Sequence, residues 1–377
     1  MRELRVEILR GENAVGENLI EITDGKSRLL LEYGVQLTPT SEGCEVEMQV
    51  KATAYDGIFI THCHADHSGL LKTRANTQAV YMGKATHKIL SYCKGISAPL
   101  QGKIVYMQNE KALKIGEIKV TPYLCDHSAY DSYMLLIEKG EERILYTGDF
   151  RSSGRKSFQA LLNRLPEKVD VLITEGTNYG RNVQVLTEAG LEEKAVALFK
   201  ESKRIFILQS TLNIDRTVTM YRAAKKTGKT FIQTLASAEI CAMLKNIPEP
   251  AQFKDCYTYL RKGVNGARYE ELREKYGKKL LSKSQIAEMD GFVMQVSSNA
   301  LSYLQELAKY CDLKGSLLVY SMWEGYKEKM HTFLSGVEKL AIKRVTLHSS
   351  GHADICAIEA LQERVNPTQS IFVHRER

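Results

Sequence analysis

Three histidines and an aspartate lie within six residues of the chain, as His62, His64, Asp66 and His67. They follow the apolar run 57–61, which predicts a strand, and they lead into a helical pattern. Side chains alternate along a strand, so its end directs His62 and His64 to the same side. The turn into the helix brings Asp66 and His67 around to a second point. Imidazole and carboxylate are the usual zinc ligands of hydrolytic sites, so one short loop could serve two neighbouring cations.

This segment resembles the His-x-His-x-Asp-His signature of the metallo-β-lactamase fold. Two later segments are similar to the rest of that family's metal site. Cys125-Asp126-His127-Ser128 follows a predicted strand and resembles the stretch that supplies the third histidine of the first metal. Gly148-Asp149 follows another predicted strand and resembles the motif whose aspartate bridges both metals. Glu32 stands where the family more often has aspartate, and the resemblance implies a structural role for it.

Three further segments resemble a narrower group, the β-CASP nucleases, and within it ribonuclease J. The segment 174–177, Thr-Glu-Gly-Thr, is similar to the first β-CASP motif, an acidic residue at a strand end. The segment 349–353, Ser-Ser-Gly-His-Ala, closely matches the second motif. The segment 370–374 resembles the third, whose terminal histidine completes the second metal site. The resemblance spans nearly the whole chain.

The resemblance implies a site with two divalent metal ions, zinc or, as the alternative, manganese. Its ligands would be His62, His64 and His127 on one metal, Asp66, His67 and His374 on the other, and Asp149 between them. His352 would act on the scissile phosphate, and Glu175 would lie behind His352, hold its orientation and raise its pKa. The backbone amides of Ser350, Gly351 and Ala353 could cradle a phosphate.

A weaker similarity to ribonuclease J lies in the segment 209–216. There Ser210, Asn213 and Arg216 open a predicted helix, and a helix N-terminus can bind a phosphate. An ordinary helix cap explains the same residues equally well.

The hydrophobic pattern predicts an α/β protein in two parts. Short strands dominate the first 179 residues, and from residue 180 helices of about fifteen residues alternate with buried strands. Together with this pattern, the resemblance implies a metallo-β-lactamase αββα sandwich over residues 1–179 and 339–377, interrupted by a β-CASP parallel α/β domain over residues 180–338. The last part is expected to be a strand, a helix and a strand over residues 344–373.

Composition excludes several classes of protein. The chain has 377 residues, 44% hydrophobic and 26% charged, which excludes disordered, collagen-like and coiled-coil chains. No apolar stretch is long enough to cross a membrane, and charges occupy the start where a signal peptide would be apolar. Its eight cysteines include no Cys-x-x-Cys pair. These features predict a reduced, cytoplasmic protein without a membrane partner, and they leave a homo-oligomer open.

The distribution of net charge bears on the class of substrate. The chain carries +7, and residues 180–338 hold 24 Lys and Arg against 18 Asp and Glu, a balance of +6. Solvated helix faces and a positive wall for nucleic acid both account for this excess.

Three functions compete to explain these residues. The first is a two-metal phosphodiester hydrolase, a ribonuclease that attacks single-stranded RNA, or alternatively DNA, with a metal-activated hydroxide. The second is a two-metal hydrolase of a small ester, lactone or thioester, because this fold hosts many reactions. The third is a nucleic-acid binder without catalysis. The basic insert and the Ser-Gly-His-Ala loop together favour the first, and the complete ligand set argues against the third.

Overall fold

A computed structural model describes residues 3–37, 40–73, 78–93, 103–181, 185–261 and 266–375. The chain divides into two compact units. The split unit contains residues 1–185 and 351–377, and the inserted unit contains residues 186–350. Among the described residues, no helix combines the length and apolarity that a membrane crossing requires.

The first sheet of the split unit has six strands in the order β1-β2-β3-β4-β5-β6. Their bounds are Arg5–Arg10, Leu19–Thr23, Arg28–Leu31, Gly57–Phe59, Val80–Met82 and Ile104–Tyr106. The turn at Gly25, with φ of 81°, joins β2 and β3 as an antiparallel hairpin. β4 lies between β3 and β5 and is parallel to both, and the histidine loop departs from its carboxyl end.

The second sheet also has six strands, in the order β19-β11-β10-β9-β8-β7. In that order their bounds are Gln369–Val373, Val171–Glu175, Glu142–Tyr146, Ser132–Lys139, Ile118–Cys125 and Leu113–Ile115. Alternate residues of both sheets face each other in one apolar core; Ile22, Leu31 and Phe59 meet Val120 and Leu135 there. Burial of these side chains is the main force that holds the two sheets face to face.

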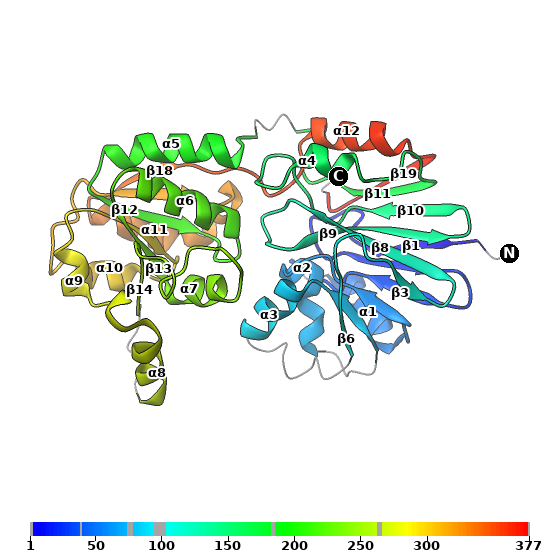
Figure 1. Cartoon of the computed structure of the whole chain (residues 1–377), viewed down its shortest axis with the longest axis horizontal. Coiled ribbons are helices and arrows are strands. Elements are labelled where there is room, and N and C mark those ends of the chain that lie inside the picture. Colours follow the sequence, from blue (N-terminus) through cyan, green and yellow to red (C-terminus); the bar gives the residue numbers. More distant parts are fainter. Residues whose placement is uncertain are drawn as a thin grey trace. The chain divides into compact units, whose positions relative to one another are not determined.

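Helices cover the outer faces of the two sheets (Figure 1). α4 (Phe158–Leu162) and α12 (Ile355–Val365) pack Leu161 and Leu361 against Leu136, Leu145 and Leu172 of the second sheet. α1 (Ser41–Ala52), α2 (Ala65–Ser68) and α3 (Lys84–Tyr92) lie on the opposite side, and the 3₁₀ turn η1 (Gly69–Thr73) directly follows α2 in the chain. This is the αββα sandwich that the sequence predicts.

The inserted unit is built on one parallel sheet of seven strands in the order β15-β14-β13-β16-β12-β17-β18. In that order their bounds are Leu280–Leu281, Cys256–Tyr259, Thr230–Thr234, Phe292–Val296, Arg204–Gln209, Leu317–Ser321 and Lys343–Thr346. The central strands read as continuous apolar runs because helices cover both faces.

The helices of the inserted unit form two layers. α5 (Glu188–Lys200) and α6 (Ile214–Lys226) pack Phe199 and Met220 on one face, and α10 (Leu301–Leu307) and α11 (His331–Lys339) pack Leu304 and Phe333 on the other. The remaining elements are α7 (Leu235–Ala242), α8 (Ala267–Tyr276), α9 (Lys283–Ala287), and the 3₁₀ turns η2 (Gly277–Lys279), η3 (Glu324–Tyr326) and η4 (Glu328–Met330).

The boundaries between the units differ from the sequence-based ones. The structure places the first after residue 185 rather than 179, and the second after residue 350 rather than 338. The second differs because β18 pairs with β17, Val345 opposite Val319, and so extends the inserted sheet. The predicted strand–helix–strand over 344–373 is therefore not one unit, since β19 pairs with β11 in the split unit. An apolar strand does not itself reveal which sheet it joins.

Candidate metal centre

The histidine loop leaves β4 and enters α2, for which His64 is the N-cap residue. Glu32 holds the loop in place; it is a fully buried residue with a left-handed φ of 64°. The Glu32 carboxylate accepts hydrogen bonds from the Thr61 amide at 3.1 Å and from the Thr61 hydroxyl. It also lies 3.2 Å from Nδ1 of His67. A left-handed φ is unfavourable for glutamate and persists only where surrounding contacts hold it. The contacts of Glu32 with Thr61 and His67 therefore connect this buried residue to the start of the loop.

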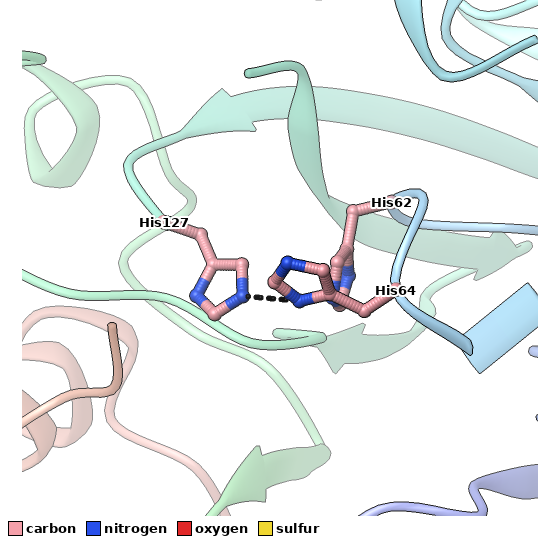
Figure 2. A group of neighbouring side chains, drawn as sticks. All are labelled: His62, His64 and His127. Atoms are coloured by element: carbon pink, nitrogen blue, oxygen red, sulfur yellow. Dashed lines mark hydrogen bonds between the residues drawn. The ribbon is translucent and has the colours of Figure 1, made fainter. Parts of the chain in front are cut away.

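Three histidines converge on one point. Nδ1 of His64 lies 3.0 Å from Nε2 of His62 and 3.1 Å from Nε2 of His127. Figure 2 shows the three rings turned toward one another, two from the loop after β4 and one from the loop after β8. His62 and His127 are completely or almost completely buried. The structure thus brings together the three residues predicted for the first metal.

A second group lies beside the first. Oδ2 of Asp66 is 3.2 Å from Nε2 of His374 and 3.8 Å from Nε2 of His67. These three residues each offer a ligand atom, and the three atoms all lie within 4.8 Å of one another. His374 follows β19 and takes a left-handed φ of 57°, and its amide donates to the Gly11 carbonyl at 2.6 Å. The residues predicted for the second metal therefore come together from distant parts of the chain.

Asp149 occupies the centre of both groups. Its Oδ2 lies 3.2 Å from Nε2 of His67, 3.6 Å from that of His374, and 3.8 and 3.9 Å from those of His127 and His62. Its Oδ1 is buried and has no hydrogen-bond partner among the described residues. A buried carboxylate oxygen without a partner is costly unless a cation binds it.

The turn that presents Asp149 requires glycine at the preceding position. Gly148 has φ of 53°, and a Cβ there would lie 2.9 to 3.0 Å from three side-chain atoms of Thr61. Glycine alone tolerates both that φ and that approach. The Gly-Asp motif and the histidine loop are thus packed directly against each other.

The ring nitrogens that face away from the centre meet oxygen atoms. Nδ1 of His127 donates to the Gly351 carbonyl at 2.6 Å, Nδ1 of His374 lies 2.7 Å from the Thr177 hydroxyl, and Nδ1 of His62 lies 3.0 Å from that of Thr61. Such partners fix the tautomer and turn the other nitrogen toward a metal. Thr61 and Thr177 have no role in the sequence-based prediction. Their position beside predicted motif residues was the only signal that could have found them.

The charges of these groups also suit cations. Burial lowers the pKa of His62 and of His127 well below the ordinary value and that of His64 to about 4, so these rings are neutral at pH 7. Burial opposes ionisation of Asp149, but His374 and His67 outweigh it and hold its pKa well below the usual range. Neutral imidazoles and ionised carboxylates are the forms that bind metals. His67 differs, because Asp149, Glu32 and Asp66 outweigh its burial and raise its pKa well above the usual range, so a metal bound there would displace its proton. The donor set fits two divalent cations.

His352 lies at the edge of this cluster and is paired with Glu175. Its Nδ1 is 2.9 Å from Oε2 of Glu175 and 3.6 Å from Oδ2 of Asp149. Burial would lower the pKa of His352, but Glu175 and Asp149 outweigh it and raise that pKa to about 9. Glu175 is itself buried and accepts from the Phe150 amide at 2.8 Å, which fixes its carboxylate. The arrangement places Glu175 behind His352, where the sequence resemblance put it.

Three of the residues predicted to contact phosphate are engaged within the protein. Arg216 is fully buried, its Nη2 lies 3.0 Å from Oε1 of Glu188, and its Nη1 donates to the Ser321 hydroxyl. Asn213 is the N-cap of α6 and accepts from the Arg216 amide. The Ala353 amide donates to Oε1 of Glu175 at 3.3 Å. Arg216 is therefore engaged inside the inserted unit, with a buried partner that the sequence did not reveal.

The other predicted phosphate residues keep some exposure. Ser210 is exposed, and Ser350, Gly351 and His352 are partly exposed. A Cβ at Gly351 would lie 2.9 Å from the Ser128 hydroxyl, so the absence of a side chain there lets its carbonyl reach His127. Gly351 therefore positions a predicted metal ligand as well as standing beside His352.

Comparison with known proteins decides the family. A family model described as "Beta-lactamase superfamily domain" matches residues 36–231, just over half of the chain. The chain belongs to the β-lactamase superfamily. In structure it is similar to a protein of unknown function from Enterococcus faecalis V583, with a TM-score of 0.78 over 98% of this chain and 93% of that one. At 18% identity that likeness supports the fold alone.

Curated relatives carry more specific names. "Probable RNase MJ4" of Methanocaldococcus jannaschii is 24% identical over 53% of this chain and 55% of its own. "Transcription termination factor FttA" of Thermococcus kodakarensis is 22% identical over 53% and 36%. "Cleavage and polyadenylation specificity factor 73" of Drosophila melanogaster is 27% identical over 48% and 29%. The chain matches about half or less of each relative's length. These matches confirm the predicted resemblance to the metallo-β-lactamase fold and its β-CASP group.

Proposed function

We propose that this β-lactamase superfamily chain is a metal-dependent nuclease of the β-CASP group that hydrolyses phosphodiester bonds in single-stranded RNA. The observation that carries the proposal is the position of Asp149, whose Oδ2 lies within 3.9 Å of nitrogens from four of the histidines proposed as metal ligands. One carboxylate shared by two ligand groups is the arrangement expected for two adjacent metal ions.

The first group, His62, His64 and His127, would hold one ion, and the second, Asp66, His67 and His374, would hold the other. The nitrogen-rich set favours zinc over the oxygen-preferring cations. When bound, the two ions would supply a hydroxide at neutral pH and would neutralise charge that develops on the phosphate oxygens.

His352 would donate a proton to the sugar oxygen that leaves when the phosphodiester bond breaks. Glu175 outweighs burial and raises the pKa of His352 in the metal-free protein, which favours a protonated ring that can donate to this oxygen. Glu175 would keep the ring aligned through its 2.9 Å contact with Nδ1, leaving Nε2 to serve the substrate. Ser350 and Gly351 would border the phosphate.

The substrate class rests on the relatives and on charge. One relative is named a probable RNase and another a cleavage and polyadenylation specificity factor, which favours RNA over a small ester. The positive balance of the insert suits a polyanion. RNA is proposed ahead of DNA on the names of these relatives.

The test uses purified protein loaded with zinc or with manganese. End-labelled single-stranded RNA and DNA of one sequence, bearing a 5′ triphosphate, monophosphate or hydroxyl, are incubated with it and resolved on a sequencing gel. We expect metal-dependent cleavage of RNA that disappears in Asp149→Asn. The ladder of cleavage products shows both the direction in which the enzyme degrades the strand and the 5′ end that it prefers.

A parallel assay with p-nitrophenyl acetate and a simple lactone distinguishes the alternative. Hydrolysis of these esters without cleavage of either nucleic acid would reject the nuclease and favour a small-ester hydrolase. RNA binding without cleavage by fully metal-loaded protein would favour a binding protein.

A further inference from the structure

The inserted unit contains a cavity of about 840 Å³ beside its edge strand β15. The cavity is lined by Leu280 and Leu281 of that strand, by Gly277 and Lys278 before it and by residues 282–285 after it. α8 and α10 contribute further walls. Its size lies within the range of roughly 300–1,000 Å³ that ligand sites usually have.

The charge of this cavity has one sign. Four cationic side chains line it, Arg261, Arg273, Lys278 and Lys283, and the described lining residues include no aspartate or glutamate. Arg273 has Glu270 at 3.9 Å, a contact between two largely exposed side chains. Such a pair is weak in water, so it does not cancel the positive field. The field favours a ligand with several negative charges.

Aromatic rings are interleaved with these cations. Lys283 lies 5.2 Å from the ring centre of Tyr303, and Arg273 lies 5.8 Å from that of Tyr269. Tyr303 is almost fully buried and forms the floor, whereas Tyr310 at the rim is 58% exposed. An exposed flat ring beside cations suits a nucleotide, which offers a base to stack and a phosphate to bind. An acidic peptide would use the cations but leave the Tyr310 ring without a stacking partner.

We propose that this cavity binds single-stranded nucleic acid, with a base stacked on Tyr310 and phosphates held by Lys278, Lys283, Arg261 and Arg273. The proposal rests on the proposed function, because it assigns the strand held there to the RNA that the metal centre would cleave. It differs from the phosphate contacts expected from the sequence, which included Arg216.

The test measures binding apart from cleavage. Fluorescein-labelled U12 is titrated with metal-free protein in EDTA, and its anisotropy is followed. We expect Kd to rise about tenfold in Lys278→Glu/Lys283→Glu, and the slope of log affinity against log salt to fall by about 0.7 for each phosphate that the variant no longer neutralises. The matched control, Lys200→Glu/Lys314→Glu, makes the same charge change at exposed positions outside the cavity and should stay within about twofold.

A second pair of variants tests the stacking. Tyr310→Ala should weaken binding of U12 at least about fivefold, which corresponds to the lower end of base stacking at about 1 kcal/mol. Tyr310→Phe keeps the ring and should bind like the wild type. Equal weakening by the control pair, unchanged affinity in the cavity variants, or equally tight binding of fluorescein-labelled poly-glutamate would each overturn the proposal.

Failure of this inference can be told from failure of the proposed function. The cavity variants change no residue of the proposed metal centre, so at saturating concentrations of labelled RNA they should cleave it at the wild-type maximal rate. If the cavity variants weaken U12 binding but the wild-type protein cleaves no RNA, the proposed nuclease function is wrong and the proposed nucleic-acid binding by the cavity is supported. If the wild-type protein cleaves RNA and no cavity variant alters U12 binding, the proposed binding role of the cavity is wrong and the proposed nuclease function is supported.

Discussion

The two late histidines should have different tasks, and substitution can separate them. His374 contacts Asp66 at 3.2 Å and Asp149 at 3.6 Å, so it belongs to the second ligand group. His352 reaches Asp149 at the same 3.6 Å, but its Nδ1 is held more closely by Glu175, at 2.9 Å. We therefore expect His374→Ala to lose metal and His352→Ala to keep it.

The magnitudes follow from these roles. Loss of a hydrogen-bond partner of a ligand weakens metal affinity by about 10–100-fold, and loss of the His374 ligand should exceed that at the second site. His352→Ala should keep two ions per chain while kcat falls by about 10²–10⁴-fold, the usual contribution of a positioned acid or base.

The assay pairs elemental analysis of metal-loaded protein with single-turnover cleavage of labelled RNA. His331→Ala, an exposed position at the start of α11, is the matched histidine control and should change neither quantity. Metal loss in His352→Ala, or RNA cleavage by it at the wild-type rate, would refute the assignment of His352. Two retained ions in His374→Ala would refute that of His374.

Three further outcomes are expected. Asp149→Asn should lose more metal than any single histidine variant, because it removes the charge shared by both groups; elemental analysis showing two ions in it would contradict the central role of Asp149. Arg216→Met should lower the free energy of unfolding by about 3–5 kcal/mol by leaving Glu188 buried without its partner, and urea denaturation of Arg216→Met/Glu188→Leu should recover much of that loss. In metal-free protein, the raised pKa of His352 contributes stability that is complete below about pH 6.5 and is lost as pH rises through about 9, since the folded state holds the proton more tightly. The stability difference between wild type and His352→Gln should therefore shrink by up to about 3 kcal/mol over that range, and a difference that grows with pH would show the sign to be wrong.

The sequence alone determined the elements and the chemistry of the histidine loop. Its ligands are adjacent in the chain, so strand alternation and the following helix turn fix where they point. The strands that the sequence predicts at 117–124, 132–138 and 170–174 also form, as β8, β9 and β11, because each segment is rich in β-branched and other apolar residues. The approach of His127, Asp149 and His374 to the loop was expected only through family resemblance, since local patterning carries no information on contacts across two sheets.

Only the tertiary structure decided what depends on distant partners. Arg216 has the chemistry of a phosphate contact, but Glu188, 28 positions earlier, pairs with it inside the inserted unit. β18 reads as a generic strand, and its hydrogen bonds to β17 assign it to the inserted sheet rather than to the sandwich. Thr177 becomes significant only because its hydroxyl lies 2.7 Å from Nδ1 of His374, 197 positions away. Residue type sets which contacts a side chain can make, and burial beside a partner brought close by folding decides which contact it does make.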